Sequence, residues 1–378
     1  MILINVQVLN YKSIEDSTNV CINKDITILV GQNESGKTAF LQALYKSEPV
    51  ERDSQFDYIS DYPRKDVLEY EERHERSPDL ASKFNYELEP DEIGNINTDL
   101  KFNLLSSLKF SISHNYKNSR VIGLDVNEEK YVQYLIGNSN FNQATKEHLS
   151  EISTIKDLII QLESLDLNTE DTTHLTEIKH KFFTDKENWS FLSYYIYNQF
   201  LAPNIPQFLY FDDYKLLPGK INLPTLQKDL ANYELNMDRN ILDGEQKSVL
   251  SLLSLANVDL NKIVESHGYE QYKSRLEGIS NLITRKIFDF WNQSSDLEVE
   301  FDIRADSSDK TPFNIGNNLY IRIKNRRHNV TVPFDQRSKG FIWFFSFIVA
   351  FDRIKKDYGT VKDLIPSISG LDQTLLSN

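Results

Sequence analysis

The chain is 378 residues long, with 40% hydrophobic and 26% charged residues and a formal net charge of −14. This length and composition are those of a globular protein of about two or three structural units. The acidic balance excludes a surface that is basic throughout, so general attraction to DNA is not expected. No segment approaches the roughly 20 apolar residues that a membrane span requires.

Cysteine and histidine usage argues against metal and disulfide chemistry. The one cysteine, Cys21, excludes an internal disulfide and a cysteine-based zinc site. We expect Cys21 to pack as a small hydrophobic side chain in a core, and a reducing cytoplasm is the natural location for such a chain. The seven histidines are scattered without metal-ligand spacing, so a catalytic zinc site is not supported.

The first third of the chain predicts strands. Alternating apolar residues indicate a strand at 1–9 and a short one at 18–23, and a continuous apolar run predicts a buried strand at 26–30. Residues 56–76 are polar and predict a loop with a short helix. Three further alternating segments, which predict an antiparallel sheet beside the first strands, follow at 83–88, 108–112 and 121–126.

A complete G-x-x-x-x-G-K-[ST] motif occupies Gly31–Thr38, between the apolar run at 26–30 and a helical pattern at 38–44. This strand–loop–helix context favours a phosphate-binding loop over a chance glycine-rich turn. Backbone N–H groups and the helix N-terminus surround an anion, Lys37 reaches the β- and γ-phosphates, and Thr38 holds Mg²⁺. The predicted ATP-binding residues of the loop are Gly31, Asn33, Glu34, Ser35, Gly36, Lys37, Thr38 and Ala39.

The remainder of the chain changes from helical to strand periodicity. Apolar residues at helical spacing predict a helical insertion at 141–295, interrupted by a strand-like run at 208–211. Strands are expected again at 297–303, 319–323 and 330–333, and a helix at 338–358. The predicted domains are therefore an N-terminal part at 1–140, the insertion at 141–295 as an arm or a bundle, and a C-terminal part at 296–378.

Two segments resemble the SMC/RecF-like branch of ABC-type ATPases, and within it the ATPase part of the OLD (overcoming lysogenization defect) family. The first runs from Val8-Leu9-Asn10-Tyr11-Lys12-Ser13-Ile14 to the phosphate loop, and the second is Asp335-Gln336-Arg337-Ser338-Lys339-Gly340 before the last helix. The resemblance implies an α/β fold: an ABC-type P-loop ATPase head with a mixed sheet, an antiparallel β subdomain and an α-helical insertion. It also implies that Lys12 and Ser13 contact nucleotide, and that Ser338 and Gly340 face the nucleotide of a second subunit.

The chain departs from that family where hydrolysis is performed. The family has an apolar strand ending in Asp-Glu after the last helix, the Walker B element, whereas residues 359–370 contain Pro366 and no acidic pair. Asp212 and Asp213 follow an apolar run and have the form of a Walker B, which makes them weak catalytic candidates. Because they precede the signature segment, a structural strand closed by a turn at 217–219 is the favoured interpretation.

These features predict an ATP- and Mg²⁺-binding head that dimerises around nucleotide, is DNA-linked in genome maintenance or anti-phage defence, and hydrolyses ATP poorly alone. A partner protein then supplies a nuclease or the missing carboxylates. Two alternatives remain: a non-hydrolysing regulatory module, and the front part of a longer ATPase–nuclease. The basic segment Lys324–His328 is a candidate DNA contact, although a solvated turn is the favoured interpretation.

Overall fold

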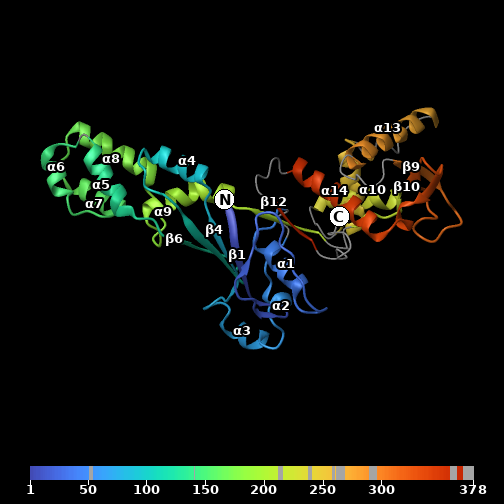
Figure 1. Cartoon of the computed structure of the whole chain (residues 1–378), viewed down its shortest axis with the longest axis horizontal. Helices are drawn as coiled ribbons and strands as arrows, with labels where there is room; N and C mark the ends of the chain where they lie inside the picture. Colours follow the sequence, from blue (N-terminus) through green and yellow to red (C-terminus); the bar gives the residue numbers. More distant parts are fainter. Residues whose placement is uncertain are drawn as a thin grey trace. The chain divides into compact units, whose positions relative to one another are not determined.

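The chain folds into two compact units, Met1–Leu209 with Lys362–Ile365, and Tyr210–Val361 with Pro366–Asn378. Figure 1 shows the elements of this computed structural model in the colours of the sequence. The boundaries predicted at 140/141 and 295/296 stay a prediction, since the segment between them contributes to both units. The residues that the structure describes are 1–50, 54–139, 141–211, 216–236, 241–257, 260, 269–288, 296–357 and 364–368.

An antiparallel sheet forms the centre of the first unit and confirms the sheet expected from alternation. Its strand order is β2-β1-β4-β5-β6, with β3 also paired to β1. Val6, Val8 and Phe84 are fully buried on it, because every second side chain of a strand points to one face. The strands are β1 (Ile2–Tyr11), β2 (Ile14–Asp16), β3 (Val20–Cys21), β4 (Leu80–Glu87), β5 (Lys109–Asn115) and β6 (Arg120–Leu124).

Two expectations for this region are wrong. Cys21 is exposed rather than buried, because β3 is a two-residue edge strand. Residues 26–30 form no strand, and Ile26, Ile28 and Val30 are 64%, 57% and 75% exposed. An apolar run predicts an extended segment but does not supply a neighbour for its backbone hydrogen bonds, and no described strand pairs with this segment.

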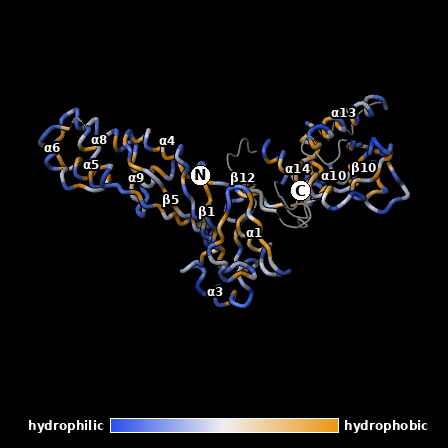
Figure 2. The backbone as a smooth tube through the Cα atoms, in the orientation of Figure 1, coloured by the Kyte–Doolittle hydropathy of each residue, from blue (hydrophilic) through white to orange (hydrophobic). Residues whose placement is uncertain are grey.

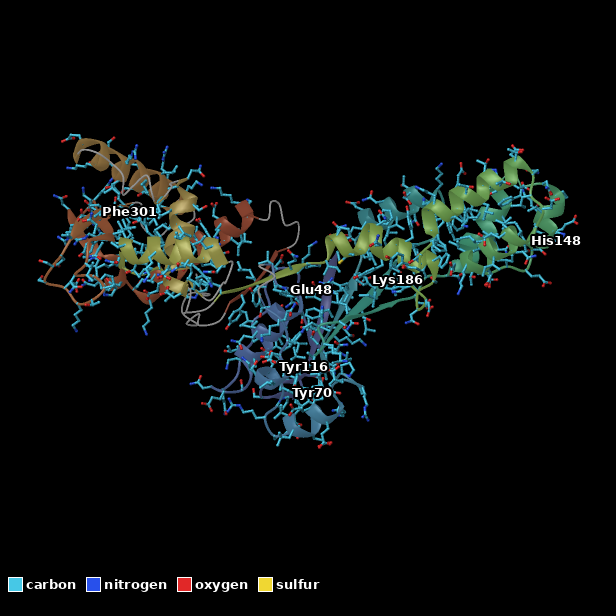
Figure 3. All side chains as sticks on the ribbon, turned by 180° about the vertical axis from the view of Figure 1, so that it is seen from behind. Glu48, Tyr70, Tyr116, His148, Lys186 and Phe301 are labelled. Carbon is cyan, nitrogen blue, oxygen red and sulfur yellow. The ribbon has the colours of Figure 1, made fainter. Side chains whose placement is uncertain are left out.

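Short helices surround the sheet of the first unit. Helix α1 (Lys37–Ser47) contacts β1 and β4. Helices α2 (Tyr58–Asp61) and α3 (Val67–Arg73) lie within 56–76, where a short helix was expected, while α4 (Pro90–Leu100) was not predicted. The ring of Tyr70, in α3, stacks on the ring of Tyr62 with centroids 4.2 Å apart and meets the ring of Tyr116 edge-on with centroids 5.7 Å apart. Figure 3 shows Tyr70 and Tyr116 side by side at the end of the sheet.

The helices after the sheet form a compact bundle, visible in green at the end of the first unit in Figure 1. Each begins at a polar residue whose side-chain oxygen accepts a backbone N–H of the first turn, which stabilises a short helix. These N-cap residues are Asn127, Asn142, Thr154, Asn168 and Ser190. The helices are α5 (Glu128–Asn138), α6 (Gln143–His148), α7 (Ile155–Ser164), α8 (Thr169–Phe182) and α9 (Phe191–Ile196), followed by a π-helical turn (Tyr197–Leu201) and a 3₁₀ turn (Ala202–Asn204).

The second unit has a four-stranded antiparallel sheet with β10 at its centre. Figure 2 shows apolar residues gathered on β10, α10 and α14, and the side chains of Ile321, Phe334 and Phe345 are completely buried in this core. The strands predicted here are confirmed. The elements are β8 (Lys220–Asn222), α10 (Leu223–Asn236), α11 (Gly244–Leu255), α13 (Tyr269–Phe288), β9 (Leu297–Ala305), β10 (Asn317–Asn325), β11 (Val330–Pro333), a 3₁₀ turn (Phe334–Gln336) and α14 (Lys339–Asp357).

A separate two-stranded sheet joins β7 (Gln207–Phe211) to β12 (Leu364–Ile368). Pro366 therefore does not prevent a strand, which corrects the expectation for residues 359–370. Proline lacks a backbone N–H, but an edge strand tolerates it because only one side of the strand must be paired. Strand β7 also makes a parallel bridge to Pro49, so a chain segment just after α1 pairs in parallel with it.

Candidate nucleotide-binding site

The phosphate loop ends where glycine allows a left-handed turn into α1. Gly36 precedes the first helical residue with φ 88°, and a Cβ at this position would lie 3.2 Å from Cγ1 of Ile14. No side chain caps the helix and its first turn contains no acidic residue. The first backbone N–H groups of α1 and its positive dipole end are thus left for an anion, as a phosphate site requires.

Lys37 lies over the loop that it is expected to serve. Its ammonium donates to the carbonyl oxygens of Gly31 at 2.8 Å and Gln32 at 2.7 Å. These contacts hold a positive charge at the mouth of the loop and help to shape the loop backbone. The loop residues 31–35 and Thr38 are exposed, while Ala39 is buried and anchors the helix. Glu34 has φ 65°, an unusual backbone for a side chain with a Cβ.

The turn after β1 lies directly against the phosphate loop, and nucleotide contacts of Lys12 and Ser13 stay a prediction. Ser13 Oγ lies 3.4 Å from the ideal Cβ position of Gly36, which places residues 12–14 beside the start of α1. The ammonium of Lys12 donates to Oε1 of Gln42 at 2.6 Å, so it is held against α1 rather than in the loop. Desolvation lowers the pKa of Lys12, an effect that the nearby Asp61 carboxylate opposes.

Ser338 and Gly340 stand at the start of α14 in the second unit. Ser338 Oγ accepts the backbone N–H of Phe341 at 3.4 Å, the arrangement of an N-cap. Gly340 lies in the first turn of the same helix. This local geometry fits both an ordinary cap and the implied signature role, so the signature role of the pair stays a prediction.

The acidic candidates Asp212 and Asp213 lie outside the described residues. Strand β7 before them is buried at Phe208, Leu209 and Phe211, as expected for an apolar run. Among the described residues, no group of three or more His, Cys, Asp or Glu side chains is placed to hold a metal ion. Catalytic roles for the two aspartates therefore stay a prediction.

Glu48, at the end of the phosphate-loop helix, is a residue that sequence reasoning missed. Its buried carboxylate accepts from Nε2 of His114 at 3.0 Å and from a guanidinium nitrogen of Arg120 at 2.6 Å. A carboxylate at a helix C-terminus opposes the helix dipole, so only its tertiary partners explain this position. The Glu48 carbonyl also accepts the N–H of Phe208 at 2.8 Å, which ties α1 to β7.

Replacing Gly36 with alanine tests the loop geometry. The left-handed φ and the close Ile14 side chain should together cost about 1–2 kcal/mol of unfolding free energy and weaken ATP binding at the distorted loop. Gly94→Ala is the matched control, because no atom lies within 4 Å of its Cβ position, and alanine there should stabilise α4 by about 0.5–1 kcal/mol. Urea denaturation of both variants checks the difference. Equal stability of the two would contradict it.

The phosphate loop and the family match together define an ATPase domain with a P-loop. The chain belongs to the family described as AAA ATPase domain (AAA_15), whose model matches residues 1–364. No curated protein matches it. No helix among the described residues is long and apolar enough to cross a membrane.

The solved structures that resemble the chain include three SMC heads. An SMC head bound to the C-terminal winged-helix domain of ScpA shares 11% identity at a TM-score of 0.30, covering 94% of this chain and 77% of that one. The SMC head of Pyrococcus furiosus, with an extended coiled coil and bound to the C-terminal domain of ScpA, shares 13% identity at a TM-score of 0.27, and the match covers 94% of this chain and 79% of that one. The SMC head of Pyrococcus yayanosii, with a coiled coil and joint, shares 9% identity at a TM-score of 0.26, and the match covers 94% of this chain and 84% of that one. TM-scores this low carry no argument of their own.

Proposed function

We propose that this chain binds ATP with Mg²⁺ on Gly31–Thr38 and uses the bound nucleotide to assemble with other subunits, while hydrolysing it very slowly alone. The observation that carries the proposal is the open start of α1, with no capping side chain and an ammonium held over the loop. These groups fit a triphosphate, and the Thr38 hydroxyl would hold Mg²⁺, which neutralises phosphate charge when bound.

Slow hydrolysis is expected from the sequence after the last helix. P-loop chemistry requires a second metal carboxylate and a group that positions the attacking water. Residues 359–370 contain no acidic pair that would supply them. The alternative is a non-hydrolysing regulatory module, in which nucleotide stabilises an assembled state. In either case the dimer would bring Ser338 and Gly340 of one subunit to the phosphate loop of another.

The DNA-linked part of the proposal, in genome maintenance or anti-phage defence with a nuclease partner, rests on the OLD resemblance alone. The basic hairpin at 324–328 adds little support, because Arg326 is paired with Glu298 across the sheet. Lys324 is half-buried in the same sheet, directly opposite Glu298. Glu298 therefore neutralises part of the charge that would attract a phosphate backbone.

Turnover separates an ATPase from a regulatory module. We expect the purified chain to bind ATP with saturation while releasing phosphate at well below about one turnover per second, because transition-state stabilisation is incomplete. Phosphate release measured beside nucleotide binding checks this. Turnover near one per second that disappears in Lys37→Ala would contradict the proposal, and an equal loss in Asp213→Ala would identify Asp213 as the Walker B carboxylate.

A further inference from the structure

Lys12 occupies a position of the chain where the backbone favours glycine. Lys12 and Ser13 form the two-residue turn between β1 and β2, since Tyr11 pairs with Ile14 across it. The first residue of this turn, Lys12, has φ 50°, in the left-handed region that strains a residue with a side chain. Such strain persists where neighbouring contacts fix the backbone, and it is concentrated at functional sites. The conformation of the turn therefore does not explain a lysine here, whereas a role for its ammonium does.

Contacts from two other segments hold both the backbone and the side chain of Lys12. Its backbone N–H donates to the carbonyl oxygen of Asp61 at 2.6 Å. The buried Asp61 carboxylate in turn accepts from the ammonium of Lys46, in α1, at 2.5 Å. The Lys12 ammonium itself donates to Oε1 of Gln42, also in α1, at 2.6 Å. Helix α1 thus fixes the turn through Lys46 and Asp61, and it holds the ammonium through Gln42.

The Lys12 side chain starts close to the phosphate loop but ends away from it. Ser13 Oγ lies 3.4 Å from the ideal Cβ position of Gly36, and the Cα atom of Lys12 is about 3.8 Å from that of Ser13. Gln42 lies five residues after Lys37, which is about 8 Å along the helix axis from the start of α1. Rotation about side-chain bonds therefore moves the ammonium between Gln42 and an anion at the loop while the turn stays in place.

The two positions of the ammonium differ in the charge that they offer. Gln42 supplies a neutral amide oxygen, and desolvation lowers the pKa of Lys12 there, an effect that Asp61 opposes and Lys46 increases. A triphosphate supplies negatively charged oxygens, which attract an ammonium more strongly than an amide oxygen does. A ligand that interacts better with one arrangement of a protein shifts the population towards that arrangement.

We propose that Gln42 restrains Lys12, and that a nucleotide on Gly31–Thr38 must take the ammonium of Lys12 from Gln42, so that binding is weaker than it would be without this contact. The inference rests on the proposed function, because it requires a nucleotide on this loop. It adds a residue that sets the affinity and that no sequence motif marks. Gln42 acts through Lys12, so it is a positioning residue rather than a direct nucleotide contact.

A double-mutant cycle between Gln42 and Lys12, followed by titration calorimetry with ATP and Mg²⁺, tests this role. Gln42→Leu removes the acceptor at similar volume and should tighten binding about threefold to tenfold, as expected for one net hydrogen bond. Gln42→Glu gives Lys12 a charged acceptor and should weaken binding, less so at high salt. In a Lys12→Ala background the effect of Gln42→Leu should vanish, and that of Gln42→Glu should shrink to the direct repulsion between carboxylate and phosphates.

The matched control is Gln143→Leu, the same substitution on the exposed face of α6, which should leave the affinity unchanged. Circular dichroism checks that each variant is folded. Opposite changes in the two Gln42 variants would support the proposal, because damage to the fold would weaken binding in both. Weaker binding in both, no change in either, or a Gln42→Leu effect that persists in Lys12→Ala would overturn it. If instead Lys37→Ala bound ATP as tightly as the wild type, the proposed function itself would fail and this inference with it.

Discussion

Replacing Lys37 with alanine is expected to weaken ATP binding about 100-fold, the largest functional effect of any single substitution in this chain. The substitution removes one charge-assisted hydrogen bond to phosphate, and such bonds contribute about 1.5–3 kcal/mol each. The Lys37 ammonium also donates to the carbonyl oxygens of Gly31 and Gln32, so alanine loosens the loop that donates the remaining hydrogen bonds. Titration calorimetry with ATP and Mg²⁺ measures the change.

Two controls distinguish charge from folding. Lys37→Arg keeps the charge but replaces a compact ammonium with a planar guanidinium, and should recover only part of the affinity. Lys130→Ala removes an exposed lysine from α5, far along the chain from the loop, and should leave the affinity unchanged. Affinity for ATP within about threefold of the wild type in Lys37→Ala would show that the loop is not the nucleotide site.

Replacing Glu48 with alanine is expected to lower the unfolding free energy by about 3 kcal/mol, the largest effect on stability. The substitution leaves the buried His114 ring and the Arg120 guanidinium without their carboxylate partner. We discount the upper part of the usual range, because the Arg120 side chain is 45% exposed and water screens its share. Urea denaturation followed by circular dichroism measures the loss.

The control for Glu48 is Glu129→Ala, which removes an exposed carboxylate from the first turn of α5 and should cost well below 1 kcal/mol. Glu48→Gln keeps the size and one acceptor oxygen, and should fall between the two variants. If Glu48→Ala were as stable as the wild type, the carboxylate would not stabilise the joint between α1 and β7.

Local chemistry made the phosphate loop and most elements predictable. Gly36, Lys37 and Thr38 at fixed spacing before an apolar helix predict a phosphate-binding loop, because such a loop requires only backbone conformation and charge within a few residues. Alternation determined β1, β4 and β10 in the same way, since a half-buried strand needs a period of two. The N-caps of the bundle helices are local features too, because each cap side chain accepts a backbone N–H only three residues away.

The sequence by itself thus determined the phosphate loop, the antiparallel sheets and the helical bundle's existence. Only the tertiary structure decided that residues 26–30 lack a neighbouring strand, that Glu48 pairs with His114, and that a proline-containing strand forms after α14. The physical reason is separation along the chain, because the hydrogen-bond partners of a strand and of a buried carboxylate come from residues far away in the sequence. Apolar periodicity predicts which side chains must be buried, but only the tertiary structure determines which residues bury them.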